Sequence, residues 1–377
     1  MAQLLPPKEA ITKLLGSMAQ LGASDLHLKV GYSPYYRVAG HLRRVDMPPL
    51  PNTQFIEEML SDLVPAARRH EYDERGDLDF SAAIPSGDRF RVNVYRATGE
   101  MHAALRRVQS KIPSFEDLRL PTIYRDTIVR SIEGLILVSG VTGSGKSSTL
   151  AAMLQHLNEV HSMHVITIED PIEYVFTPKK SIISQREIGI DIPSYPEALR
   201  YVVRQDPDCI LIGELRDRET MLAALQASET GHLVLGSLHC SDAQQTFARI
   251  LEFFPRNEHA FIRSSLANSL TAIMCQRLLP GVEPDKRYPA TEVLLNNAIT
   301  KDKILHEQDG DIPAIIDQCH EEGMRSFTFS LCEMIEKDWI HYDTAMEYAP
   351  NREALASMVK GIKSSGQSLI GRVRSTR

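Results

Sequence analysis

Along the first 108 residues, the pattern of hydrophobic and polar positions predicts one helix followed by several short strands. Between residues 7 and 21, apolar side chains recur every three or four residues, as on one face of a helix. Later segments alternate between apolar and polar residues, which is typical of strands that bury one face. These segments are 24–28, 34–45, 78–84, 89–96 and 101–108, and residues 53–74 return to helical spacing between them. We therefore expect an α+β unit with a mainly antiparallel sheet over residues 1–108.

The pattern changes after a proline-containing stretch, residues 109–122, which we interpret as a linker. The segment GLILVSG that begins at Gly134 is apolar without alternation, as in a parallel strand covered on both faces. Similar apolar runs follow helical stretches at residues 164–168, 209–213 and 232–238. This alternation predicts a doubly wound α/β domain over residues 123–360, with a largely helical part beyond Asp242. The basic segment 361–377 is interpreted as a disordered tail.

The most specific motif is GVTGSGKSS, which lies between a predicted strand and a predicted helix. It matches G-x-x-x-x-G-K-[ST], in which glycines let backbone N–H groups turn toward a β-phosphate. Lys146 adds a positive charge for the β- and γ-phosphates, and the Ser147 hydroxyl is placed to contact Mg²⁺. We therefore expect ATP and Mg²⁺ to bind at this loop. The expected nucleotide contacts are Gly140, Val141, Thr142, Gly143, Ser144, Gly145, Lys146, Ser147 and Ser148.

An acidic segment, ITIEDPIEYV, follows the P-loop helix at the end of the next predicted strand. It contains Glu169, Asp170 and Glu173. In doubly wound sheets, ligands bind outside the carboxyl ends of the strands, so we expect these acids to project toward the nucleotide. A carboxylate in that place can polarise the water that attacks the γ-phosphate.

A second acidic segment, CILIGELRD, raises a question about the magnesium site. Strands that hold magnesium in P-loop ATPases usually end in Asp, but here Gly213 stands at that position and Glu214 follows it. Glutamate is longer than aspartate and can reach from one residue further along. We expect Glu214 to complete the magnesium shell and Gly213 to make room beside the phosphates.

Composition excludes several classes of function. The formal net charge of −7 argues against a dedicated nucleic-acid binder. The five cysteines are widely spaced without a C-x-x-C pair, which predicts reduced thiols rather than disulfides or a zinc module. Neither a signal peptide nor a membrane-spanning helix is expected from the sequence.

Taken in order, these motifs resemble the type IV pilus retraction ATPases, the PilT/PilU branch of the secretion ATPase superfamily. The resemblance covers most of the chain. It is carried by GASDLHL, RFRVN, the P-loop, ITIEDPIEYV, ISQREIG, EALRYVVRQDPD, IGELRDRET, ETGHLVLGSLH and EEGMRSF. The order of Gly before Glu in the magnesium strand is itself a feature of this superfamily. The resemblance therefore favours a functional variant of the magnesium-binding strand over one that has lost its function.

The resemblance implies a homohexamer of RecA-like ATPase domains, each preceded by a PAS-like domain, that hydrolyses ATP to depolymerise pilin and power twitching motility. It also implies a cytoplasmic protein at the inner membrane, in contact with the pilus platform protein and a paralogous retraction ATPase. Roles follow by matching motifs. Glu173 would be the catalytic glutamate, Glu214 would support magnesium, His232 and His239 would sense the nucleotide, and Arg91 and Arg106 would reach it from the N-terminal domain, across the subunit boundary.

Some positions depart from the family. Val141 replaces a usual proline in the P-loop, and Cys240 stands where a threonine is common. The retraction motor's AIRNLIRE-type signature is absent, and EVLLN and EEGMRSF are closer to the accessory PilU type. Two other classes of function stay open: an assembly module that binds ATP with weak hydrolysis, and a nucleic-acid translocase.

Overall fold

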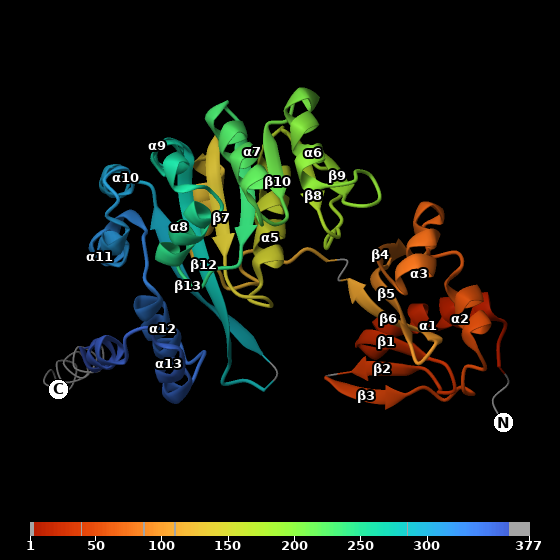
Figure 1. The fold of residues 1–377 in the computed structure, drawn as a ribbon. Coiled ribbons are helices and arrows are strands. Elements are labelled where there is room, and N and C mark those ends of the chain that lie inside the picture. Colours follow the sequence, from red (N-terminus) through yellow and green to blue (C-terminus); the bar gives the residue numbers. More distant parts are fainter. Residues whose placement is uncertain (1–3, 39, 86, 109–110, 285, 362–377) are drawn as a thin grey trace, which may run out of the picture. The chain divides into compact units, whose positions relative to one another are not determined.

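The computed structural model describes residues 4–38, 40–85, 87–108, 111–284 and 286–361, and the chain divides into two compact units. Unit 1 extends to Ile112 and also includes the separate segment Asp170–Val175. Unit 2 comprises Pro113–Glu169 and the chain from Phe176 onward. Each unit has its own sheet and its own hydrophobic core (Figure 1). The predicted tail lies outside the described residues beyond residue 361.

Unit 1 contains a six-stranded sheet in the order β3-β2-β1-β6-β5-β4, with every neighbouring pair antiparallel. The strands are β1 (Ala23–Lys29), β2 (Tyr35–Val38), β3 (His41–Arg44), β4 (Asp77–Ala83), β5 (Arg89–Ala97) and β6 (Glu100–Val108). The inward side chains of these strands, except the exposed β3, form a core with α1 (Pro7–Leu21) and α2 (Thr53–Leu60). The predicted helix and strands of this unit are therefore confirmed.

The helical pattern over residues 53–74 is interrupted in the structure. Helix α2 ends at Leu60, and a second helix, α3, covers Arg69–Arg75. Pro65 precedes a short 3-10 turn between them. Proline has no N–H to donate and clashes with the preceding helical turn, so one continuous helix cannot pass through it.

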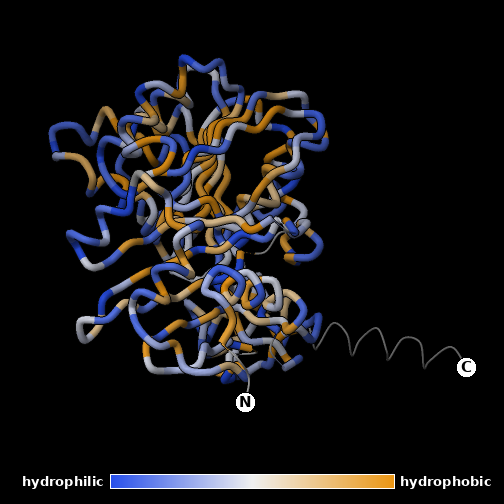
Figure 2. Tube along the Cα trace, turned by 90° about the vertical axis from the view of Figure 1, so that its right-hand side faces the viewer, coloured by the Kyte–Doolittle hydropathy of each residue, from blue (hydrophilic) through white to orange (hydrophobic). Residues whose placement is uncertain are grey.

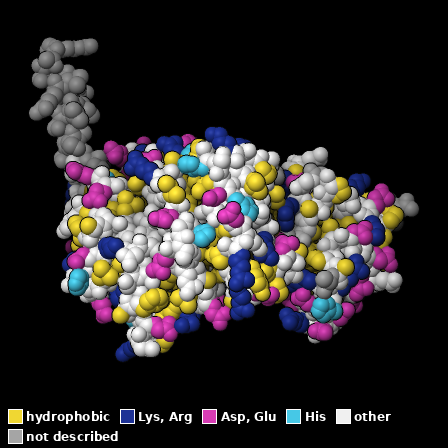
Figure 3. Space-filling view, turned by 90° about the horizontal axis from the view of Figure 1, so that it is seen from above, with side chains coloured by type: hydrophobic (Ala, Val, Ile, Leu, Met, Phe, Trp, Pro, Cys, Tyr) yellow, Lys and Arg dark blue, Asp and Glu magenta, His cyan; other side chains and the backbone are white. Residues whose placement is uncertain are grey.

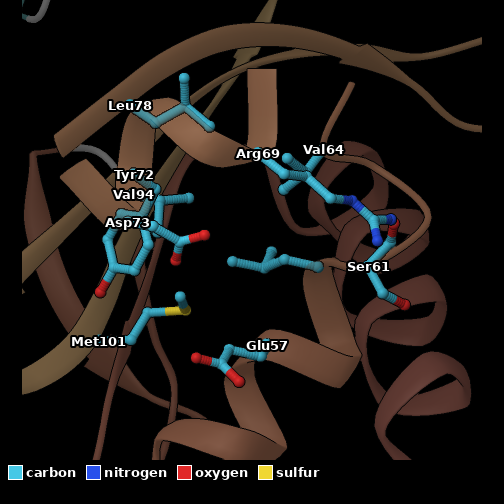
Figure 4. A pocket seen from close by; sticks show the side chains of 10 residues that line it. Glu57, Ser61, Val64, Arg69, Tyr72, Asp73, Leu78, Val94 and Met101 are labelled. Carbon is cyan, nitrogen blue, oxygen red and sulfur yellow. The ribbon is translucent and has the colours of Figure 1, made fainter. Parts of the chain in front are cut away.

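A cavity of about 260 Å³ lies in unit 1, between α2, α3 and the strands β4, β5 and β6. Leu78, Val94 and Met101 line it from the sheet, and the carboxylates of Glu57 and Asp73 extend toward it from the helices (Figure 4). It is built from unit 1 residues alone and shares none of them with the P-loop motif.

Unit 2 contains a seven-stranded mixed sheet in the order β13-β12-β7-β11-β10-β8-β9. All neighbours are parallel except β12 and β13, which are antiparallel. The strands are β7 (Gly134–Ser139), β8 (His164–Glu169), β9 (Ile182–Glu187), β10 (Cys209–Ile212), β11 (Leu233–Leu238), β12 (Leu270–Pro280) and β13 (Arg287–Leu295).

Every residue of β7, β10 and β11 is buried, as expected for parallel strands covered by helices on both faces. Figure 2 shows these central strands as mostly hydrophobic. The helices are α4 (Thr122–Arg130), α5 (Lys146–Val160), α6 (Tyr195–Val202), α7 (Arg218–Glu229), α8 (Ala243–Glu252), α9 (His259–Ser269), α10 (Ala298–Leu305), α11 (Ile312–Gln318), α12 (Phe327–Glu336) and α13 (Tyr342–Tyr348). The expected α/β architecture is confirmed.

Most described elements beyond Asp242 are helices, as expected, but the expectation missed two strands. Strands β12 and β13 are 11 and 9 residues long and form one edge of the sheet. In both strands, buried and less buried positions do not alternate strictly, so the sequence lacks the period of two that predicts a strand. Strand β9 is also missing from the prediction, because its two isoleucines are followed by four polar residues and give no apolar pattern.

Candidate nucleotide-binding site

The P-loop follows β7 and leads into α5, so it lies at the carboxyl edge of the parallel sheet. Strand β11 pairs in parallel with β7 and with β10, so the carboxyl ends of all three strands lie at this edge. Glu214 follows β10 and His239 follows β11, so both lie at this same edge. The sheet order thus brings together three chain segments that are separated by many residues in sequence.

Glycines shape the P-loop where backbone atoms approach closely. Gly140 has φ +157°, and a Cβ atom there would lie 2.5 Å from the carbonyl oxygen of Gln276. Gly145 has φ +92°, a left-handed conformation that L side chains rarely adopt. The predicted curling of this loop therefore requires glycine for two reasons: the left-handed φ of Gly145 and the lack of room for a Cβ atom at Gly140.

Lys146 is the first residue of α5, and its side chain folds back over the loop. Its Nζ donates to the carbonyl oxygens of Gly140 at 2.8 Å and Val141 at 3.3 Å. Lys146 is buried, while Ser147 and Ser148 are part-buried in the same helical turn. The N–H groups and positive dipole end of α5 converge here, which is the arrangement that binds phosphate.

A chain of polar contacts connects the P-loop to the ends of β10 and β11. Thr142 Oγ1 lies 3.5 Å from His239 Nδ1, and His239 Nε2 lies 3.3 Å from Glu214 Oε1. Glu214 also pairs with Arg216 at 2.8 Å. Among the predicted residues, the structure thus brings Thr142, Glu214 and His239 together.

Electrostatics fix the state of His239. Burial and the nearby charge of Lys146 lower the pKa of His239, and they outweigh the opposite effect of Glu214. The imidazole is therefore neutral at neutral pH. Its Nε2–H then donates to Glu214, and Nδ1 is left to accept from the Thr142 hydroxyl, a weak contact at this distance.

The structure corrects the expected role of Gly213. A Cβ atom on Gly213 would lie 3.1 Å from the Tyr195 hydroxyl and 3.2 Å from the carbonyl oxygen of Ile168. These nearest atoms belong to α6 and β8, not to the P-loop. Gly213 therefore makes room for the neighbouring strand and helix rather than for phosphates.

A cavity of about 700 Å³ opens at this edge of the sheet. Its lining includes Val141 of the P-loop, together with Glu214, Arg216, His239 and Arg249. A carboxylate, an imidazole and two guanidinium groups thus face one space beside the phosphate-binding loop. Such a space can hold the reacting end of a nucleotide.

The structure does not bring His232 to this site. His232 precedes β11, where its carbonyl accepts from Gly134 N at 3.1 Å and its Nδ1 lies 3.0 Å from the Ala227 carbonyl oxygen. The P-loop begins at the other end of the same strands. At about 3.3 Å per residue, the separation along β11 is roughly 20 Å. His232 is therefore too far from the P-loop of its own chain to make the expected contact with a nucleotide bound there.

The acidic segment is divided between the two units. Glu169 ends β8, and its carboxylate accepts from Thr167 Oγ1 at 2.6 Å and Gln185 Nε2 at 3.2 Å. These contacts direct it toward β9, on the far side of β8 from the P-loop strands. Asp170 and Glu173 belong to unit 1, and their roles stay predictions.

The two predicted arginines lie in unit 1. Arg91 on β5 and Arg106 on β6 are directly opposite each other in register, and both are exposed. Arg106 Nε also donates to Asp25 Oδ1 at 2.8 Å. Their proposed reach to a nucleotide stays a prediction.

Sequence reasoning missed several residues at this edge. Gln276 and Thr149 contact each other beside the loop, at 3.0 Å between Thr149 Oγ1 and Gln276 Oε1. Arg216 binds Glu214. Arg216 could have been found, because it lies in the quoted segment CILIGELRD, but Gln276 gave no signal because its strand was not predicted.

The fold and site define a P-loop ATPase with an α/β nucleotide-binding unit. Residues 2–355 match the family described as "Type II/IV secretion system protein". The chain is 38% identical to the type IV pilus retraction ATPase PilT of Pseudomonas aeruginosa over 339 residues, which cover 90% of this chain and 98% of that protein. It is 35% identical to the type IV pilus ATPase PilU of the same organism, over 92% and 91% of the two chains.

Solved structures agree with these relatives. The crystal structure of the pilus retraction motor PilT with bound ADP matches with a TM-score of 0.84 at 38% identity, covering 90% of this chain and 97% of that one. The ATPase DotB of Legionella pneumophila shares the fold, with a TM-score of 0.75 at 24% identity over 92% and 96%. The chain belongs to the type II/IV secretion system protein family and, within it, to the PilT/PilU group. The family predicted from the sequence is confirmed.

Proposed function

We propose that this chain is the ATPase motor of a type IV pilus, which hydrolyses ATP at its P-loop to power pilus retraction and twitching motility. The observation that supports this most strongly is the complete P-loop between β7 and α5, beside the Glu214–His239 pair. It occurs in a chain that matches a retraction ATPase over nearly its full length. The relative with bound ADP gives independent support for a nucleotide at this fold.

The chain's own residues hold the nucleotide in this proposal. The loop N–H groups and the start of α5 bind the phosphates, and Lys146 moves from the Gly140 carbonyl to the phosphate oxygens. The neutral His239 donates to Glu214 and keeps that carboxylate oriented toward the cavity. Glu173 is the proposed base for the attacking water, and Arg91 and Arg106 are the proposed cations supplied to a neighbouring subunit.

The residues present fit Mg²⁺. Among the described parts of the chain, no three His, Cys, Asp or Glu side chains gather as a metal cage. Mg²⁺ usually takes only one or two protein oxygens, and it keeps water and phosphate oxygens for the rest. Ser147 and Glu214 would supply a hydroxyl and a carboxylate at one edge of the sheet. When bound, the ion would neutralise charge that develops on the phosphates.

The finer assignments complete the proposal. Residues 1–108 form a PAS-like domain, 109–122 a linker, 123–360 a RecA-like ATPase domain and 361–377 a tail. Six copies form a ring that works with a pilus platform protein at the cytoplasmic face of the inner membrane, as a PilT-type motor or as an accessory PilU-type paralogue. Among the described residues, no helix is long and apolar enough to span a bilayer.

A nucleic-acid translocase is not favoured. The chain is acidic, and acidic and basic side chains are interspersed over much of the face drawn in Figure 3. Strong binding of nucleic acid requires a basic patch that neutralises phosphates. Turnover stimulated by DNA would contradict this conclusion.

The proposed function is tested with Lys146→Ala. The variant should lose ATP binding and phosphate release while keeping its fold, because the Lys146 charge is used on phosphate. A matched control is Thr300→Val, since Thr300 is buried and its Oγ1 donates to the carbonyl oxygen of Leu295, which pairs with Ala272 at the end of the β12–β13 hairpin away from Gln276. In a deletion strain, the wild-type gene should restore twitching and a low surface pilus count, and Lys146→Ala should not. Near-normal ATPase activity of Lys146→Ala would refute the assignment.

A further inference from the structure

Strand β12 runs past the end of β7 and continues beside the P-loop. The two strands pair in parallel up to Cys275, which lies opposite Ser139, the last residue of β7. Since β12 continues to Pro280, its next residue, Gln276, has the P-loop rather than a strand residue beside it. Gln276 is only 1% exposed. A buried amide requires hydrogen-bond partners, and here the loop supplies them.

The side-chain amide of Gln276 connects the loop to the first turns of α5. Its Nε2 donates to the carbonyl oxygen of Ser144 at 2.8 Å, and its Oε1 accepts from Thr149 Oγ1 at 3.0 Å. A carbonyl oxygen can only accept, so the amide nitrogen must face Ser144 and the amide oxygen must face Thr149. Ser144 and Thr149 are also buried. The bridge is therefore a fixed and dry connection.

This bridge determines the direction of one peptide group in the loop. In a trans peptide, the C=O of one residue and the N–H of the next point in opposite directions. Because Gln276 holds the Ser144 carbonyl on the β12 side, the Gly145 N–H points to the other side of the loop. Phosphate binding by a P-loop requires N–H groups directed at the anion and carbonyls directed away from it.

The glycines of the motif are also packed against this residue. A Cβ atom on Gly145 would lie 3.2 Å from Gln276 Nε2, and one on Gly140 would lie 2.5 Å from the Gln276 carbonyl oxygen. The loop therefore has little room to shift toward β12. Both ends of the phosphate loop are positioned by the same residue.

We propose that Gln276 is a positioning residue for nucleotide binding, which holds the Ser144–Gly145 peptide in the orientation that receives the phosphates. It acts through the loop and does not itself react. The inference rests on the proposed ATP site, and it adds a residue from a strand that no motif marks. It also makes the β12–β13 hairpin part of the nucleotide site.

Two variants test the bridge directly. Gln276→Leu removes both hydrogen bonds at similar side-chain size, and Gln276→Glu keeps the acceptor for Thr149 but places a carboxylate against the Ser144 carbonyl. Loss of a buried hydrogen-bond partner typically changes an equilibrium by on the order of 10-fold to 100-fold. We expect Kd for ADP and KM for ATP to rise at least about 10-fold, more in Gln276→Glu, while kcat at saturating ATP changes less.

Thr149→Val is the second, milder test, since it removes the donor to Oε1 and keeps the shape. It should raise Kd for ADP several-fold without loss of fold. Thr300→Val is the control, because the buried Thr300 donates from Oγ1 to the carbonyl oxygen of Leu295, which pairs with Ala272 at the end of the same hairpin away from Gln276. It should lower Tm in the absence of nucleotide and leave Kd and KM unchanged.

The outcomes separate this inference from the proposed function. If the wild-type protein does not bind ADP, the proposed ATP site itself fails. If the wild type binds ADP and the folded Gln276 variants bind it equally well, Gln276 is only a core residue and the inference is wrong. If both Gln276 variants are unfolded, Thr149→Val decides: wild-type affinity for ADP in that variant overturns the inference, and weakened affinity at unchanged Tm supports it.

Discussion

The two sheets of this protein carry their functional side chains in different places. In unit 2, the P-loop, Glu214 and His239 all follow the carboxyl ends of parallel strands whose faces are buried. In unit 1, Arg91 and Arg106 lie instead on an exposed sheet face, next to each other across two antiparallel strands. The comparison shows how sheet type decides where chemistry can be placed.

The physical reason is the covering of each sheet. A parallel sheet needs crossover helices on both faces, so only the loops at strand ends are open to a ligand. An antiparallel sheet can leave one face in water, and that face displays every second residue of several strands as a row. In unit 1 the row contains the exposed Arg91 and Arg106 and the part-exposed Arg37, and the buried Asp25 lies between Arg106 and Arg37 in register.

The largest expected effect tests whether the exposed arginine row serves the strand-end site of another subunit. Arg106→Ala should lower ATP turnover by on the order of 10³-fold or more, the usual contribution of an arginine finger. Mixing it with Glu173→Gln should restore part of the turnover, since some mixed sites combine an intact glutamate with an intact arginine from the neighbour. Phosphate release is the measurement.

The matched control for this experiment is Arg37→Ala. Arg37 Nε lies 3.9 Å from the same Asp25, on the same face, and its loss should leave turnover near normal. Absence of recovery in rings shown to exchange subunits would mean that Arg106 acts within its own chain or not at all. The arginines of unit 1 would then not contribute to the nucleotide site of unit 2 in a neighbouring subunit.

The next prediction compares substitutions of the two histidines at opposite ends of β11. His239→Ala should lower kcat on the order of 10²-fold, because Glu214 loses the donor that orients it. His232→Ala, at the other end of β11, should leave kcat and KM within about two-fold. Steady-state ATPase assays of both variants make the comparison. Equal losses would show that strand ends alone do not define the site.

A smaller effect concerns the stability of the strand edge in unit 2. Burial beside Asp242 raises the pKa of Glu292 to about 7, although its carboxylate accepts from Ala243 N at 2.9 Å. The folded state therefore binds a proton that the unfolded state has lost, so stability falls as pH rises from the ordinary glutamate range to about 7.

Glu292→Gln should remove this loss. The variant should gain about 1–2 kcal/mol relative to wild type above pH 7 and little near pH 4. Urea unfolding at both pH values is the measurement, with Glu252→Gln at the exposed end of α8 as the control. A gain that does not depend on pH would assign the effect to packing instead.

The smallest effect concerns Asp25, which is buried beside Arg106 of the exposed row. Burial opposes ionisation of Asp25, but hydrogen bonds from Ser24 and Arg106 outweigh it and lower the pKa of Asp25. This stabilisation is present above the ordinary aspartate range and is lost as pH falls through the lowered pKa. Because Arg106 is largely exposed, Asp25→Asn should cost only about 0.5 kcal/mol, less in high salt. Urea unfolding at two salt concentrations checks it.

Much of the site could be predicted because its parts are local motifs. The P-loop residues specify their own backbone path, and an apolar strand before it with a helix after it confirms the context. The position of Glu214 after a buried strand was equally visible. The role of Gly213 was not, because the atoms that need its space belong to α6 and β8, which are distant in sequence.

By itself, the sequence determined most of the strands with one or two covered faces in the first 240 residues, β9 excepted, and where a phosphate loop must form. These properties depend on neighbours along the chain. The tertiary structure decided that His239 reaches the site while His232 lies roughly 20 Å away along its strand, because strand direction places them at opposite edges. It also decided that Gln276 touches the P-loop, since only the pairing of β12 with β7 brings residues 276 and 144 together.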